Sequence, residues 1–196
     1  MKKIILASSS KYRRTLLNQL GLSYDSVSPE IDETPAKDES PAALVHRLAY
    51  QKAKVVAARQ PNAITIASDQ VACIDNTILT KPGNRDNAIA QLRQCSGQTV
   101  TFYTSLCVLL PEQEFEKTIV EPFIVGFRDL TQEQIEGYVD REQPFDCAGS
   151  FKSEGLGIAL FKFLNGRDTN TLVGLPLIEL TAILFELGVD VLEPVK

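Results

Sequence analysis

Histidine, tryptophan and methionine are scarce in this sequence of 196 residues, and their scarcity narrows the chemistry that it can perform. The single histidine, His46, excludes His-rich zinc sites and leaves little room for Ser-His-Asp or Cys-His catalysis, because both need an imidazole beside the nucleophile. No Gly-Lys dipeptide is present for a P-loop, and the segment 155–157 lacks the third glycine of a dinucleotide fingerprint. Catalysis would therefore fall to carboxylates and lysines.

Paired cysteines and long apolar runs are also missing. The four cysteines form no Cys-x-x-Cys pair, which favours buried reduced thiols over disulfides. The first apolar run ends after four residues, which is too short for a signal peptide, and no segment approaches the roughly 20 apolar residues of a membrane helix. We therefore expect a cytoplasmic protein without a membrane partner.

The charge balance is acidic, with 20 Lys and Arg against 25 Asp and Glu and a net charge of -5. This balance argues against a protein that coats nucleic acid through bulk positive charge. A hydrophobic content of 44% is typical of one or two compact domains. Any anionic ligand must be held by a local basic cluster.

Apolar periodicity and turn residues predict alternating strands and helices. Strands are expected at 3–8, 24–28, 63–75, 77–79, 99–110, 117–127 and 158–164, and helices at 11–20, 41–59, 84–96, 131–141 and 176–187. The polar turn 111–114 predicts a hairpin, and the segments 29–39 and 165–171 are expected to be loops. The pattern predicts an α/β fold with a mixed sheet flanked by helices.

A serine-rich turn joins the first strand to the first helix, which opens with basic residues. Ser8 lies at the end of the strand, and Arg13 and Arg14 lie in the first turns of the helix. Backbone N–H groups at a helix N-terminus favour anions, and guanidinium groups can grip phosphate in a bidentate fork. A phosphate site is one interpretation, and a serine cap beside a solvated basic face is the other.

Two further charged residues stand where polar groups are unexpected. Asp69 follows an apolar strand at the point where polarity begins, so it could be a general base, a ligand for a divalent cation or a turn aspartate. Lys52 continues the apolar stripe of the second helix. An ammonium there is costly to bury unless an anion meets it, although its side chain could also reach out to solvent.

Two weaker candidates lie further along the chain. Lys81 precedes a Pro-Gly turn, a position that favours a surface lysine over a site residue. The loop 147–155 is rich in small residues and carries Lys152 and Glu154, a composition that allows a backbone to approach a ligand closely.

Taken together, seven segments in the same order resemble the Maf family of nucleoside triphosphate pyrophosphatases. These segments lie at 6–14, 32–34, 52–53, 68–70, 81–82, 147–151 and 170–176. The resemblance implies one Maf-like domain over 1–196, with two lobes around a central cleft in a Maf/ITPase-like fold. It also implies a cytoplasmic, dimeric hydrolase of phosphoric anhydride bonds that splits a nucleotide between its α and β phosphates.

The resemblance also implies roles for individual residues. Asp69 becomes the proton acceptor that activates water, and Glu33 together with Asp69 becomes the candidate site for Mg²⁺ or Mn²⁺. Phosphate binding is expected from six side chains: Ser8, Arg13, Arg14, Lys52, Lys81 and Lys152. The chain departs from the family at Lys11, where proline is common.

Substrate choice is expected to rest on Tyr12, Gln70 and Glu154, which match the family's 7-methylguanosine triphosphate branch, with Tyr12 in place of its usual tryptophan. The branch that acts on thymidine and uridine triphosphates has Arg, Thr and Gln at these positions. An aromatic ring and a carboxylate suit the cationic 7-methylguanine base. The expected reaction is hydrolysis of 7-methyl-GTP to its monophosphate and diphosphate, which would clear modified nucleotides. The alternatives are hydrolysis of dTTP or UTP, and a non-catalytic nucleotide-binding regulator of cell division.

Overall fold

The computed structural model describes residues 2–75 and 77–193, and the chain divides into two compact units. The first unit comprises Met1–Asp69, Thr104–Glu121 and Asp168–Lys196. The second unit comprises Gln70–Tyr103 and Pro122–Arg167. The chain therefore enters each unit more than once.

The sheet of the first unit is mixed. Its strands are β1 (Ile4–Ala7), β2 (Asp25–Val27), β3 (Ile64–Ala67) and β6 (Thr99–Leu110), of which β6 supplies residues to both units. β1 lies between β2 and β3 and is parallel to both, with Ile5 opposite Asp25 on one side and Thr65 on the other. β3 pairs antiparallel with β6, where Thr65 lies opposite Leu109. The mixed sheet predicted from the sequence is confirmed.

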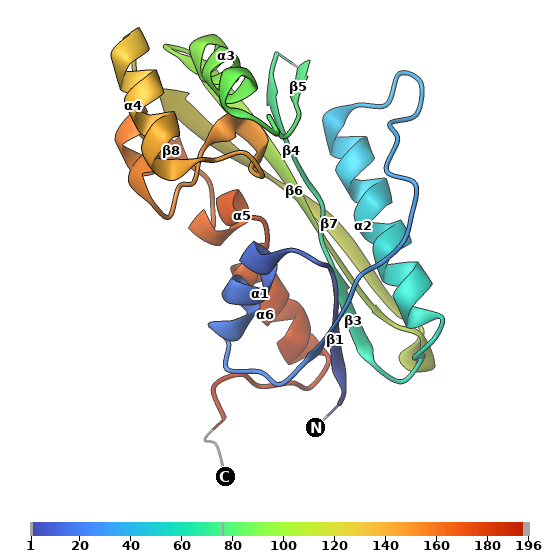
Figure 1. The fold of residues 1–196 in the computed structure, drawn as a ribbon. Coiled ribbons are helices and arrows are strands. Elements are labelled where there is room, and N and C mark those ends of the chain that lie inside the picture. The colour runs from blue at the N-terminus through green and yellow to red at the C-terminus, as the bar shows by residue number, and fades with distance from the viewer. Residues whose placement is uncertain (1, 76, 194–196) are drawn as a thin grey trace. The chain divides into compact units, whose positions relative to one another are not determined.

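Helices cover both faces of this sheet. The unit contains α1 (Lys11–Asn18), α2 (Pro41–Ala57), α5 (Thr169–Val173), α6 (Leu177–Glu186) and the short 3-10 helix η1 (Pro111–Gln113). α1 and α6 lie on one face of β1 and β3, and α2 lies on the other (Figure 1). Successive strand residues point to opposite faces, so Ile4 and Leu6 join Leu184 in one core cluster, while Ile5 joins Ala53 in the other.

The two helices that bear on the site begin at serine caps. The Ser10 side chain accepts a hydrogen bond from the Arg13 backbone N–H at the start of α1, and Ser40 caps α2 in the same way. Pro41 occupies the first turn of α2, where its missing N–H costs nothing. These caps fix the residue at which each helix begins, and therefore the position of its side chains along the sheet.

The second unit surrounds an aromatic core. Its elements are β4 (Gln70–Ile74), β5 (Thr77–Leu79), α3 (Arg85–Cys95), β7 (Phe115–Phe127, shared with the first unit), α4 (Gln132–Glu142), η2 (Ala148–Ser150), η3 (Leu156–Leu160) and β8 (Phe161–Asn165). Phe151 packs edge-to-face against Phe102, Phe127 and Phe161, with ring centroids 4.8–5.7 Å apart. β4 and β5 pair antiparallel, and so do β7 and β8. β6 pairs with β7, as the predicted hairpin requires.

Three predictions need correction. The expected loop 165–171 is wrong at its end, because α5 begins at Thr169 once the buried Asp168 caps it by accepting from the Asn170 N–H. The expected strand 158–164 begins only at Phe161, since the residues before it form a 3-10 helix. All four cysteines are free, but Cys147 is only half-buried, because it lies in a loop before η2.

The described residues contain no helix that is both long enough and apolar enough to cross a membrane.

Candidate active site

Asp69 occupies a buried position two residues after β3, with only 8% of its surface exposed. Its backbone N–H donates to the Ser105 hydroxyl at 3.0 Å, and its carbonyl accepts from the Ser105 N–H at 2.9 Å. The Ser105 hydroxyl also donates to the Val45 carbonyl of α2 at 2.7 Å. Strand β6 and helix α2 thus fix the backbone that presents the Asp69 carboxylate.

Lys52 brings two carboxylates together. It lies on the buried face of α2 and is 7% exposed. Its Nζ lies 2.5 Å from Asp69 Oδ1 and 2.7 Å from Glu33 Oε1, although the Glu33 side chain itself is 58% exposed. A buried ammonium needs such partners, because leaving water without them is costly. The anion that the sequence required for Lys52 is therefore present within the chain.

Arg13 lies near the same carboxylates and is anchored through a backbone carbonyl. Its Nε donates to the Gly174 carbonyl at 2.9 Å, and the Ser68 hydroxyl donates to the same oxygen at 2.8 Å. Burial lowers the pKa of Arg13 from its ordinary value, and the negative charges of Asp69 and Glu33 offset part of that lowering. Arg13, Glu33, Lys52 and Asp69 therefore form one electrostatic cluster within the first unit.

The turn before α1 is ordered by its serines. The buried Ser8 hydroxyl accepts from the Ser10 N–H at 3.1 Å, and the Ser8 carbonyl accepts from the Ser26 hydroxyl at 2.8 Å. Arg14 is exposed, and its Nη1 donates to the Ser9 carbonyl at 3.3 Å. The buried Ser8 hydroxyl and the solvent-facing Arg14 guanidinium therefore lie at the N-terminal end of α1, the helix that also carries Arg13.

The predicted specificity residues are divided between the units. Tyr12 lies half-buried on α1, and the Lys11 ammonium stands 5.0 Å from the centroid of its ring. Gln70 opens β4 in the second unit, and Glu154 is exposed in the loop between η2 and η3. The Lys11 ammonium thus makes a cation–π contact with the Tyr12 ring, and a cationic base stacked on this ring would make a contact of the same kind.

The remaining two predicted phosphate ligands belong to the second unit. Lys81 is exposed just after β5. The Nζ of Lys152 donates to the Glu142 carbonyl at 2.5 Å, at the C-terminal end of α4, where a cation is favoured by the unpaired carbonyls of the helix. The backbone N–H of Lys152 donates to the Tyr138 hydroxyl. In this conformation Lys152 is a helix-capping residue.

The donor set fits a magnesium-type ion better than a closed metal cage. Within residues 2–75 and 77–193, no group of three or more His, Cys, Asp or Glu side chains is placed to hold a metal. The carboxylates of Glu33 and Asp69 converge on the Lys52 Nζ. Mg²⁺ is commonly held by one or two carboxylates, with substrate phosphates and waters completing its shell. Glu33 and Asp69 supply two carboxylates of this kind, and in this structure both are paired with the Lys52 ammonium.

Sequence reasoning assigned no role to three residues that hold the site in place, although one of them, Gly174, lies in the segment 170–176 that resembles the family. Ser105 was hidden in the apolar run of β6, although a hydroxyl at a fully buried position signals a required hydrogen-bond partner. Gly174 adopts φ +123, a conformation that favours glycine, and so presents its carbonyl to Arg13. Arg47 of α2 binds the loop that carries Glu33 by donating from its Nη2 to the Thr34 carbonyl. The contacts of Ser105 and Gly174 join segments far apart in sequence.

Fold and site together define an α/β protein in which basic side chains gather around a buried carboxylate, an arrangement suited to phosphate chemistry. Residues 3–187 match the family model described as "Maf-like protein", and the chain belongs to this family.

Curated relatives match almost the whole chain. It is 53% identical over 192 residues to the "7-methyl-GTP pyrophosphatase" of Colwellia psychrerythraea, covering 98% of this chain and 96% of that protein. It is 56% identical to proteins of the same name from Nitrosococcus oceani and Alcanivorax borkumensis, covering 96% and 95% of this chain and 95% of each relative. Among solved structures, the Staphylococcus aureus Ham1 protein gives a TM-score of 0.49 at 14% identity, covering 78% of this chain and 88% of that chain.

Proposed function

We propose that this chain is a nucleoside triphosphate pyrophosphatase that hydrolyses 7-methyl-GTP to 7-methyl-GMP and diphosphate. The names of its curated relatives and their nearly full-length match at 53–56% identity support this substrate. The observation that carries the catalytic part is the buried Asp69 carboxylate, held 2.5 Å from Lys52 in the same cluster as Arg13 and Glu33. The proposed role is removal of modified nucleotides.

The proposed reaction divides the work between one carboxylate and several cations. The oxygen of a water molecule bonds to the α-phosphorus of the triphosphate, and Asp69 accepts a proton from that water. The P–O bond between the α and β phosphates breaks, and its electron pair leaves with diphosphate. A bound triphosphate carries about four negative charges, so Arg13, Lys52 and Arg14 would neutralise the leaving group as it departs. Ser8 would contribute its hydroxyl to the phosphates at the α1 N-terminus.

The metal part of the proposal rests on the two converging carboxylates. Glu33 and Asp69 would hold Mg²⁺ or Mn²⁺ together with phosphate oxygens. When bound, the ion would supply further neutralisation of charge on the diphosphate. Lys52 lies between these carboxylates and keeps both oriented toward one point.

Specificity and the second unit complete the proposal. Tyr12 would stack on the methylated base, Glu154 would face its positive charge, and Gln70 would contribute to the recognition of the base. Lys81 would reach the phosphates, and Lys152 would join it by exchanging its contact with the Glu142 carbonyl for the ligand. We propose that residues 1–196 form a single Maf-like domain with two lobes.

A substrate panel tests the proposal. The purified chain is incubated with 7-methyl-GTP, GTP, dTTP and UTP, with Mg²⁺, with Mn²⁺ or with EDTA, and released diphosphate is measured. The expected result is the fastest metal-dependent release from 7-methyl-GTP. Faster release from dTTP or UTP would support the pyrimidine alternative, and nucleotide binding without release would support a regulator.

Asp69→Asn tests the assigned base, with Asp129→Asn as the matched control. Asp129 also pairs with a lysine, with its Oδ2 2.9 Å from the Lys162 Nζ, but this pair is exposed and lies outside the Asp69 cluster. Loss of a general base typically slows turnover about 10²–10⁴-fold, and we expect this loss for Asp69→Asn only. Retained turnover in a folded Asp69→Asn variant would reject the assignment.

The wider setting of the enzyme is also proposed. We place it in the cytoplasm as a homodimer, with nucleotides rather than nucleic acids or membranes as its partners. Light scattering of the purified chain measures the oligomeric state directly, and a monomer at micromolar concentration would contradict the dimer.

A further inference from the structure

The loop that carries Glu33 is held mainly by polar contacts. Residues 32–38 are all exposed, so burial of apolar side chains contributes little to the position of this segment. Lys52 fixes the end of the Glu33 side chain, at 2.7 Å. Something else must fix the backbone, because an exposed loop of this length otherwise samples many conformations.

Arg47 supplies that fixation from α2. Its Nη2 donates to the Thr34 carbonyl at 3.1 Å, which belongs to the residue directly after Glu33. Its Nε and Nη2 also donate to the two carboxylate oxygens of Glu39, each at 2.7 Å, and its Nη1 donates to Gln51 at 3.2 Å. One guanidinium therefore joins the middle of the loop, the end of the loop and the helix.

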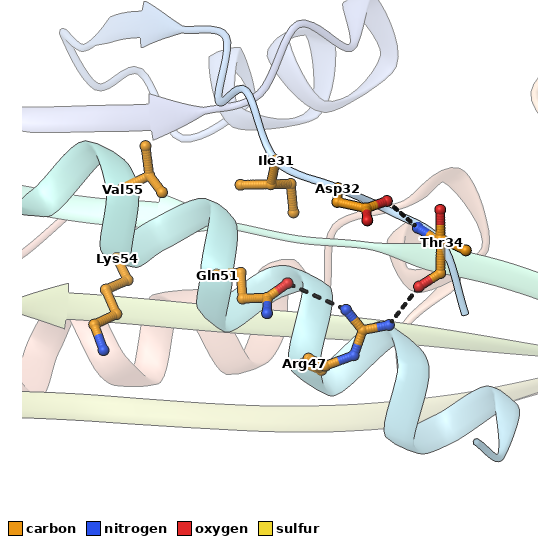
Figure 2. Close-up of a pocket in the computed structure, with 7 residues that line it drawn as sticks. All are labelled: Ile31, Asp32, Thr34, Arg47, Gln51, Lys54 and Val55. Carbon is orange, nitrogen blue, oxygen red and sulfur yellow. Dashed lines mark hydrogen bonds between the residues drawn. The ribbon is translucent and has the colours of Figure 1, made fainter. Parts of the chain in front are cut away.

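The loop completes this network with contacts of its own. The Ala36 N–H donates to Glu39 Oε2 at 2.9 Å, and the Thr34 N–H donates to Asp32 Oδ1 at 2.9 Å. Figure 2 shows Asp32 and Thr34 on the loop side, and Arg47 reaching from α2 toward Thr34 and Gln51. A pocket of about 410 Å³ opens between loop and helix, so the loop is not packed down on α2 along its length.

The charges of the network are stable. The hydrogen bonds from Arg47 and from the Ala36 N–H lower the pKa of Glu39 to about 2, and the pairing with Glu39 raises the pKa of Arg47. The hydrogen bonds with Thr34 lower the pKa of Asp32. The Arg47 guanidinium and the Glu39 carboxylate are therefore both fully charged at neutral pH, where enzymes of this kind would act.

We propose that Arg47 is a positioning residue that sets the place of Glu33 by clamping the Thr34 carbonyl and Glu39, and that it acts on catalysis only through Glu33. The inference rests on the proposed function, in which Glu33 serves the metal and the triphosphate. Arg47 and Lys52 stand on the same helix, so α2 holds the loop backbone with one residue and the loop carboxylate with the other.

Hydrogen exchange tests the clamp without using activity. In Arg47→Ala, amide exchange in the segment 30–39 should accelerate at least about tenfold, because the held backbone opens more often. Arg47→Lys keeps the charge but loses the fork, so it should fall between Arg47→Ala and the wild type. Arg85→Ala is the matched control, since Arg85 makes a two-pronged pair with Asp140 in the second unit. Unchanged exchange at 30–39 in a folded Arg47→Ala variant overturns the clamp.

A double-mutant cycle tests the route through Glu33. Arg47→Ala alone should lower kcat for 7-methyl-GTP by about 10–100-fold, because a small displacement of a site group is costly. In a Glu33→Gln background the same change should cost less than about twofold, since the residue that it positions is already lost. Arg85→Ala should leave turnover unchanged.

The outcomes separate the two proposals. If the wild type releases no diphosphate from any triphosphate, the proposed function fails, while the exchange experiment still decides the clamp. If the wild type is active and the effects of Arg47→Ala and Glu33→Gln simply multiply, the function stands and the positioning role is overturned. A Glu33→Gln variant with normal turnover also overturns it, because Arg47 would then have no catalytic group to place.

Discussion

Replacing Lys52 by methionine should strongly destabilise the protein. The ammonium is 7% exposed and touches Asp69, whose side chain is also almost completely buried, so the substitution removes the ion-pair partner of a buried carboxylate. Breaking a buried ion pair in this way typically costs about 3–5 kcal/mol. For a chain of this length each kcal/mol corresponds to about 2–4 °C, so the melting temperature should fall by about 6–20 °C.

The assay is thermal unfolding followed by circular dichroism, with two companion variants. Lys52→Met combined with Asp69→Asn removes both buried charges and should melt above Lys52→Met alone, because the unpaired carboxylate is gone. Lys162→Met removes an exposed lysine, and its partner Asp129 can turn to water, so little change is expected. A Lys52→Met variant that melts within about 2 °C of the wild type would refute the reasoning.

Three other outcomes follow from the structure. Gly174→Ala should lower the free energy of unfolding, measured in urea, by about 1–3 kcal/mol, because φ +123 strains a residue that has a Cβ. The substitution should also weaken the hydrogen bond from Arg13 Nε to the carbonyl of residue 174. Lys11→Ala should lower KM for 7-methyl-GTP about two- to fivefold, and leave KM for GTP unchanged, because it clears a cation from the Tyr12 ring. The Glu39 carboxyl should titrate by NMR near pH 2, where its pKa is lowered by its hydrogen bonds. A lowered folded-state pKa stabilises fully above the ordinary value of 4.5, and this contribution should be lost as the pH falls from 4.5 toward 2. An unchanged urea midpoint, an unchanged KM ratio or a titration near 4.5 would contradict the respective outcome.

Local patterns predicted most of the fold. Successive residues of β1 point alternately into the two core clusters. A serine cap followed by a proline in the first turn marked the start of α2. The short α5 could not be predicted in the same way, because its polar composition resembles a loop. Its start depends on the buried Asp168, whose carboxylate accepts from the backbone of both α5 and the start of α6. A contact with the next helix decided the structure there.

In the candidate site, too, local patterns could be predicted and contacts between distant segments could not. Lys52 and Asp69 could be predicted because each breaks a local pattern, the first as a charge on an apolar stripe and the second as a carboxylate at a strand end. Ser105 and Gly174 could not, since their contacts with Asp69 and Arg13 span 36 and 161 residues of sequence. Arg47 gave no signal either, because an arginine on a helix is ordinary until the loop that it binds is known.

The rate of diphosphate release from 7-methyl-GTP, compared with UTP under the same metal conditions, tests the central claim most directly. We predict a kcat/KM for 7-methyl-GTP at least about tenfold higher than for UTP, a difference of about 1.4 kcal/mol in transition-state binding. We also predict that Asp69→Asn abolishes most of the release while the protein remains folded. Equal or faster release from UTP, or undiminished release by Asp69→Asn, would contradict the account.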